Sequence, residues 1–226
     1  MSAAAPALAL AGADEAADLG GYQTRLLRFD KAAAVRVVAS GSTVGVYGRP
    51  PFDVLTLRTV ALAAGVDTTD SPDSGQLGGV DITVSAGDLL HAIADDGALA
   101  LPRPLAGATA WTGFLPPRTG WQPVGELPVA EVETAALAGI AEFKARAEAI
   151  PDRERTRAAV DRIAAEIWDR PLTFGLPVRA AHAARAMAFL GQAQSASAVV
   201  RSAGRWLRLD APFGTVVLRT GSGLLA

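Results

Sequence analysis

Residues 177–220 have the sequence PVRAAHAARAMAFLGQAQSASAVVRSAGRWLRLDAPFGTVVLRT, and only this succession of signals points to a recognisable architecture. The alanine-rich first part, 177–190, is typical of a helix. We expect a short second helix over Ser195–Ala203, because a serine stands at its N-cap position. Apolar residues over 205–209 and 215–220 predict two strands, joined by the turn around Pro212-Phe213-Gly214.

A further helix is predicted over 152–168, so the C-terminal element order is helix, helix, turn, helix and hairpin. This order resembles that of a winged helix-turn-helix. The predicted fold class is α+β, with a small mixed or antiparallel sheet domain, a helical connector and a winged-helix-like C-terminal module. The alternative for the last module is a small α+β unit that packs on the first domain or on a partner protein.

In a winged helix, the recognition helix enters the major groove and the hairpin approaches the phosphates. Gly191 stands in the turn as such proteins often have it, whereas Met187 and Gln192 depart from the usual pattern. The predicted nucleic-acid-binding residues are Ser195, Ser197 and Arg201 on the helix, Arg205 and Arg208 on the hairpin, and Arg179 and Arg185 on the preceding helix.

The charges are distributed unevenly along the 226 residues, which carry a formal net charge of −2. Residues 1–150 hold 10 basic and 17 acidic side chains, whereas residues 151–226 hold 11 arginines and 6 acidic side chains. Arginine binds phosphate and carboxylate through paired hydrogen bonds. The excess indicates either an anion-binding face or an ordinary surface in a chain that prefers arginine to lysine.

Arg153, Arg155 and Arg157 stand in the first turns of the helix predicted over 152–168, where the helix dipole disfavours cations. They form either a site for an external anion or a solvated face whose arginines pair with carboxylates of the acidic half.

The segment 101–128 contains six prolines, which exclude a helix or an interior strand, so we predict a long irregular connection. It also carries two tryptophans, which flexible linkers rarely keep. These rings either hold the connection on the first domain or form a surface that grips a partner. The predicted partner-binding residues are Trp111, Phe114, Arg118 and Trp121.

The predicted domains are an acidic α+β domain at 1–128, a helical connector at 129–170 and a basic winged-helix-like module at 171–226. In the first domain, strands are expected at 25–29, at 34–47 with a break near Gly41, at 52–63 and at 80–84, followed by a helix capped by Ser85. Helix 129–150 has a continuous apolar stripe, which predicts a helical hairpin or a homodimer contact.

Several classes of function find no support in the sequence. The chain has no cysteine, so it has neither disulfides nor thiolate chemistry. His91 and His182 are isolated, and Asp67, Asp70 and Asp73 lack the spacing of a calcium loop, so no metal site is predicted. No catalytic motif and no cofactor motif is present, and no apolar run is long enough for a membrane span.

We therefore predict a non-enzymatic, DNA-associated regulatory or accessory protein that binds duplex DNA and forms a homodimer through 129–150. The alternative is an assembly factor with no nucleic acid affinity, whose basic module docks on an acidic protein surface. An enzyme ranks third. The cytoplasm is the default location for a sequence without a basic residue before Arg25.

Overall fold

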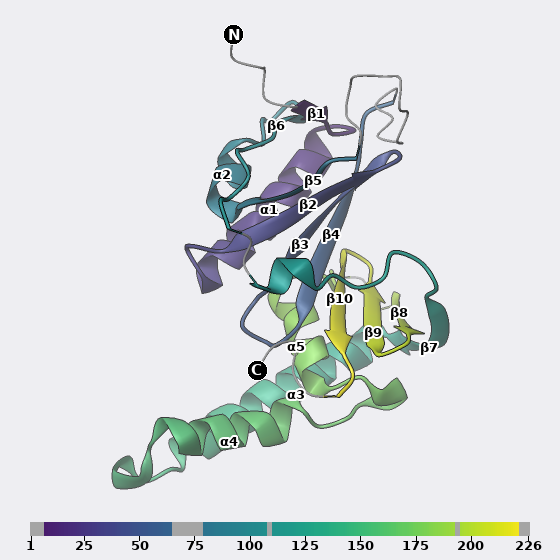
Figure 1. Ribbon diagram of the computed structural model, residues 1–226. Coiled ribbons are helices and arrows are strands. Elements are labelled where there is room, and N and C mark those ends of the chain that lie inside the picture. Colours follow the sequence, from purple (N-terminus) through teal and green to yellow (C-terminus); the bar gives the residue numbers. More distant parts are fainter. Residues whose placement is uncertain (1–6, 65–78, 108–109, 193–194, 222–226) are drawn as a thin grey trace. The chain divides into compact units, whose positions relative to one another are not determined.

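The computed structural model describes residues 7–64, 79–107, 110–192 and 195–221 (Figure 1). The chain divides into two compact units. The first unit comprises residues 1–51 and 55–115, and the second comprises residues 52–54 and 116–226. The domain boundaries predicted at 128/129 and 170/171 stay predictions.

The first unit has four antiparallel strands in the order β5, β2, β3, β4, with helices α1 and α2 in contact with each other. A two-stranded antiparallel pair, β1 with β6, completes the unit. The bounds are β1 Ala7–Ala9, α1 Ala13–Phe29, β2 Ala34–Ser40, β3 Thr43–Gly48, β4 Leu55–Ala61, β5 Asp81–Ser85, α2 Ala86–His91, β6 Ala98–Ala100 and the 3₁₀ turn η1 Ala110–Gly113.

The strand predicted at 25–29 is wrong, because these five residues are the C-terminal end of helix α1. Leu19, Tyr22 and Leu26 are buried at spacings of three and four, which is the helical period. The Gly20-Gly21 pair and the uncapped start at Gly12 conceal this period in the sequence. The break predicted near Gly41 is confirmed, since β2 and β3 form a hairpin there.

The cap predicted at Ser85 is also confirmed. The Ser85 hydroxyl oxygen accepts a hydrogen bond of 3.3 Å from the backbone N–H of Asp88. The helix it starts is shorter than expected and ends at His91.

The second unit has four antiparallel strands in the order β10, β9, β8, β7 and three helices, of which α5 contacts β10 and α3 contacts β7. Figure 1 shows α3 and α4 side by side as a helical hairpin, which we call the arm. The bounds are β7 Gln122–Pro128, α3 Val129–Glu148, η2 Asp152–Glu154, α4 Arg157–Trp168, η3 Thr173–Gly175, α5 Val178–Ala186, β8 Ser197–Ala203, β9 Trp206–Ala211 and β10 Gly214–Arg219.

The α+β class is confirmed, but the winged-helix arrangement is wrong. Residues 197–203, predicted as the recognition helix, form strand β8, which pairs with β7 on one side and β9 on the other. Ala198 and Val200 are fully buried and alternate with more exposed residues, so the segment has a period of two. Within the described residues, no helix lies between α5 and the final hairpin, which is itself confirmed.

The connection at 101–128 is less irregular than predicted, because its last seven residues form β7. Pro123 and Pro128 are tolerated there because β7 pairs only with β8 among the described residues, so its other edge needs no donors. The helix predicted at 129–150 is confirmed as α3. The next helix starts late, at Arg157, where Thr156 accepts a 3.2 Å hydrogen bond from the N–H of Ala159.

Candidate functional site

The strands β8, β9 and β10 have one apolar side and one side on which polar residues predominate, although Val217 on that second side, the partner of Arg208, is also buried. Ala198, Val200, Leu209 and Leu218 belong to the buried side, on which α5 packs. The opposite side carries a concentration of arginine and tryptophan, which we call the outer face. Its members are Arg201, Trp206, Arg208, Asp210, Thr215 and Arg219, together with Trp121 from the connection.

At the centre of the outer face, one carboxylate holds two arginines. Arg201 donates from Nε to Asp210 Oδ2 at 3.0 Å, and Arg208 donates from Nε to Asp210 Oδ1 at 2.7 Å. The Thr215 hydroxyl donates to the same Oδ1 at 2.8 Å. All three charged side chains are partly exposed, with relative accessibilities between 22% and 34%. The network therefore orients two guanidinium groups at the surface and leaves them one positive charge in excess.

The two arginines keep most of their donors available. A guanidinium group has five N–H donors, and each of these arginines uses its Nε–H on Asp210. Within the described residues, no hydrogen bond joins their Nη atoms to another protein group. The pair can consequently offer its Nη donors to an anion from solution.

Trp121 supports Arg208 from the side of the connection. The guanidinium carbon of Arg208 lies 5.1 Å from the centroid of the Trp121 ring, which is within cation–π range. The ring is itself held, because Trp121 Nε1 donates to the carbonyl oxygen of Pro117 at 2.8 Å. Trp121 is thus part of the arginine network.

A second pair of arginines lies at the end of the same face. Arg219 lies 5.7 Å from the centroid of the Trp206 ring, and the two residues are partners across β9 and β10. Arg205 precedes Trp206 in the β8–β9 turn, and its carbonyl accepts from the N–H of Thr220. In the described part of the chain, neither arginine forms an ion pair. Arg201, Arg208 and Arg219 with Asp210 give the outer face a net charge of +2, and Arg205 in the adjoining turn adds one more positive charge.

The structure does not bring all the predicted nucleic-acid-binding residues together. Arg179 and Arg185 lie on α5, on the buried side of the sheet, where they pair with Asp169 and Glu133. Ser195 precedes β8, and Ser197 is its first residue, four positions before Arg201 and on the same side of the sheet. Of the predicted residues, Arg201 and Arg208 belong to the arginine network and Arg205 adjoins it, and sequence reasoning missed Trp206, Asp210, Thr215 and Arg219.

The predicted partner-binding residues are also separated. Trp111 is buried in the first unit, where the carbonyl of its neighbour Thr112 accepts a hydrogen bond from Arg36. Phe114 is 51% exposed in that unit, whereas Arg118 and Trp121 belong to the second. The burial of Trp111 supports the packing interpretation for this end of the connection.

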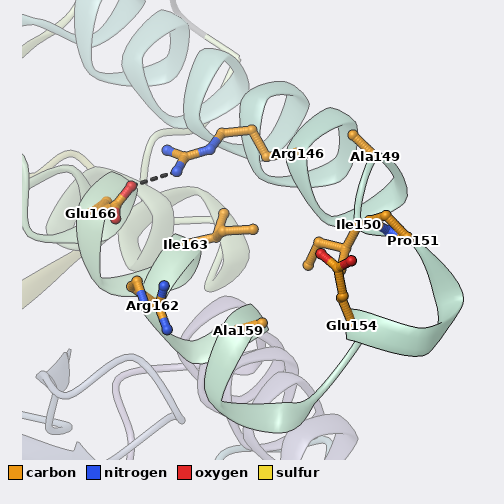
Figure 2. Close-up of a pocket in the computed structure, with 9 residues that line it drawn as sticks. All are labelled: Arg146, Ala149, Ile150, Pro151, Glu154, Ala159, Arg162, Ile163 and Glu166. Atoms are coloured by element: carbon orange, nitrogen blue, oxygen red, sulfur yellow. Dashed lines mark hydrogen bonds and ion pairs between the residues drawn. The ribbon is translucent and has the colours of Figure 1, made fainter.

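The arm contains a cleft of about 480 Å³ between the ends of its helices (Figure 2). Ile150 and Ile163 form apolar walls, and Arg146 forms an ion pair with Glu166 beside them. The cleft has two arginines and two glutamates, so it carries no net charge. It is lined by Arg146, Ala149, Ile150, Pro151, Glu154, Ala159, Arg162, Ile163 and Glu166.

The arginines at the tip of the arm pair with carboxylates of their own segment. Arg153 pairs with Glu154 at 3.2 Å, and Arg155 pairs with Asp152 at 3.4 Å. Arg157 pairs with Asp161 at 3.6 Å. One interpretation of the sequence expected these arginines to pair with carboxylates of the acidic half, residues 1–150. Their partners are instead carboxylates of the same segment.

His182 is the centre of an aromatic cluster in the second unit. Its ring lies 4.5 Å from Trp168 and 4.7 Å from Phe52, between ring centroids. Burial lowers the pKa of His182, and the nearby charge of Arg185 lowers it further. The lowered pKa favours the neutral ring at pH 7. Its contacts are with aromatic side chains, which indicates a role in packing.

Among the described residues, no group of three His, Asp or Glu side chains could hold a metal ion. Asp67, Asp70 and Asp73 lie outside the described residues. Within the same part of the chain, none of the helices has both the length and the apolar composition that crossing a membrane requires.

Two sequence families match the chain. Residues 3–113 match a domain of unknown function (DUF8010), and residues 116–223 match another domain of unknown function (DUF8185). The boundary between the two matches falls where the two structural units meet in the sequence. No curated protein matches the sequence.

Solved structures similar to the chain include a DNA polymerase subunit and two DNA polymerase sliding clamps. The chain is similar to DNA polymerase III subunit beta from Borrelia burgdorferi, with a TM-score of 0.51 and 7% identity over 96% of this chain and 65% of that protein. The DNA polymerase sliding clamps from Pseudomonas aeruginosa and Caulobacter crescentus have TM-scores of 0.48 and 0.49, with 11% and 13% identity over 96% and 95% of this chain. The chain spans 64% and 65% of the length of these two clamps. At such identities the likeness to the Borrelia protein shows the fold alone.

Proposed function

We propose that this chain is a non-enzymatic, DNA-associated accessory protein. The observation that carries the proposal is the fold likeness to a subunit of a DNA polymerase, which extends over 96% of the chain. The net positive outer face supports it, because Lys and Arg side chains supply most of the affinity of proteins for a nucleic acid backbone. The winged-helix mode of binding has no part in this proposal.

The outer face offers three to four arginines to phosphates. Contacts of this kind release condensed counterions, so affinity falls as salt rises. For three phosphate contacts on duplex DNA, the expected loss between 50 and 200 mM salt is about 40-fold. Because residues 197–203 form strand β8 and not the predicted recognition helix, we expect binding without base-sequence preference.

The test is a fluorescence anisotropy titration of the full chain with a labelled random duplex at both salt concentrations. The variant R201A/R205A/R208A is expected to lose most of the affinity and to flatten the salt dependence. The matched control is R153A/R155A/R157A, which removes the same charge at the tip of the arm. If both variants lose the same affinity, the loss comes from the lower net charge of the chain and not from the outer face. If R201A/R205A/R208A binds DNA as tightly as the wild type, the outer face is not the binding site.

The alternative is an assembly factor without nucleic acid affinity that docks on an acidic protein surface. Two observations argue against nucleic acid affinity and so favour the alternative over DNA binding: many arginines already have carboxylate partners, and the whole chain has a net charge of −2. The alternative predicts no anisotropy change at either salt concentration. In the second unit, the paired arginines are Arg146, Arg153, Arg155, Arg157, Arg170, Arg179, Arg185, Arg201 and Arg208.

A further inference from the structure

We infer that the outer face binds single-stranded nucleic acid in preference to a duplex, with a phosphate on the Arg201–Arg208 pair and unstacked bases against Trp206 and Trp121. This inference rests on the proposed function and names the form of nucleic acid that the site takes. It is carried by the juxtaposition of two preorganised guanidinium groups and two partly exposed indole rings on one sheet face.

The phosphate position follows from the way Asp210 holds the arginines. Both are anchored through Nε, so their forks are fixed in orientation while their Nη atoms have no bonded partner among the described protein groups. Arg201 and Arg208 are direct partners across β8 and β9, which places their backbones about 5 Å apart. Because their Nε atoms bind the two oxygens of one carboxylate, the two guanidinium groups lie close together, so both can donate to the oxygens of the same phosphate. Asp210 takes part by orientation and does not touch the ligand.

The base positions follow from the tryptophans. Trp206 lies two residues before Arg208 on the same strand and points to the same side, about 7 Å along the strand. Trp121 lies on Arg208 itself. Neither ring is buried, and each has an arginine on it. An alternation of cation and indole is the arrangement that binds single strands, because every unstacked base has a π-face to stack.

A duplex cannot use the same rings. Its bases are stacked on each other, so only its phosphates and groove edges are available. A sheet face with tryptophans therefore gains nothing from them on duplex DNA, whereas each stacked base of a single strand adds affinity. We therefore expect the outer face to bind a single strand more tightly than a duplex.

The experiment compares a labelled 20-nucleotide oligothymidylate with a labelled hairpin duplex of the same number of nucleotides, using the full chain. We expect the single strand to bind at least about fivefold more tightly, since one stacked base contributes that much or more. Trp206→Ala should remove most of this preference and leave duplex binding unchanged. Trp206→Phe keeps a ring at the same position and should retain the preference, which separates loss of stacking from loss of folding.

A charge-conserving variant tests the phosphate position. In R201K/R208K the charges stay but the Nε anchors and the forks are lost, and we expect about tenfold weaker single-strand binding. The matched control R153K/R157K makes the same exchange at the tip of the arm and should bind as the wild type does. Inorganic polyphosphate should compete with the labelled single strand for the arginines. Because it has no bases, its affinity should be the same for the wild type and Trp206→Ala, whereas the affinity for the single strand should fall in Trp206→Ala.

Failure of the inference and failure of the proposed function give different results. If the wild type binds neither probe, the proposed function is wrong. If it binds the duplex as tightly as the single strand and Trp206→Ala changes nothing, the proposed function stands and the inference is wrong. If R201K/R208K binds as the wild type does, the arginines act as diffuse charge and the phosphate position is wrong.

Discussion

Gly48→Ala is expected to destabilise the first unit, because the glycine lets α1 lie close to β3. A Cβ at Gly48 would lie 2.5 Å from Leu26 Cδ1 and 2.7 Å from the Tyr22 hydroxyl oxygen. Both side chains are buried, so they have little room to move away. The Tyr22 hydroxyl also bonds Thr56, with 2.9 Å to its Oγ1 and 3.2 Å to its carbonyl, so displacing the ring breaks this link between α1 and β4.

The magnitude follows from three terms. Overpacking in a filled core costs about 1–3 kcal/mol, and a lost buried hydrogen bond costs about 1 kcal/mol. Replacing glycine by alanine returns about 0.4–1 kcal/mol through the unfolded chain. The expected loss is about 1–3.5 kcal/mol, which lowers the midpoint of urea unfolding by roughly 0.5–2 M.

The measurement is urea unfolding of the full chain followed by circular dichroism. Gly113→Ala is the matched control, since an added Cβ there meets nothing within 4 Å and the variant should equal or exceed the wild type in stability. In a Tyr22→Phe background, the cost of Gly48→Ala should fall by about 0.5–1.5 kcal/mol, because one of the two clashing groups is gone. Equal midpoints for Gly48→Ala and Gly113→Ala would show that α1 does not lie on β3 in this way.

Three further predictions concern the second unit. The pKa of His182 is lower in the folded chain than the ordinary histidine value of about 6.5, so the unfolded chain binds a proton first as pH falls. The melting temperature should therefore fall between pH 7 and pH 5. The fall should be smaller in His182→Gln, which cannot bind this proton. Gly125→Ala should cost about 1–3 kcal/mol in urea unfolding, because the added Cβ would lie 2.2 Å from the Phe174 ring, and Phe174→Ala should cancel most of this cost. Self-association through 129–150 stays a prediction, and Ile150→Asp should abolish it in sedimentation velocity, since Ile150 lies in the half-exposed end of the arm.

The sequence predicts those elements whose signals are local. Ser85 is recognisable as a cap because its partner stands three residues away, and the hairpin of β9 and β10 is recognisable from its alternation around a short turn. Helix α3 is recognisable from its apolar stripe. Part of that stripe serves the unit itself, because Val129, Val132 and Ala136 are buried there.

The elements that were missed depend on partners far away in the sequence. Strand β8 has two alanines, two valines and two serines among its seven residues, so its composition does not decide between helix and strand. It is a strand because β7 and β9 lie on both sides of it. Strand β7 begins 75 residues before β8, so the residues next to 197–203 carry no signal that predicts this pairing. Pairing with β7 and β9 therefore outweighs the helix-capping signal of Ser195. Without the helix predicted there, the winged-helix prediction is wrong.

The charge excess of the last 76 residues was a poor guide to the site, because it counts arginines without regard to which nitrogen atoms are already bonded. Arg170 donates from both Nη atoms to Glu142, at 2.9 Å each. Arg201 and Arg208 bind their carboxylate through Nε, so both of their Nη atoms are without a bonded protein partner among the described residues. The same residue type in the same kind of ion pair therefore has its paired Nη donors engaged at one position and available to an anion at the other. Arg170→Lys should accordingly leave single-strand binding unchanged in the assay in which R201K/R208K weakens it about tenfold.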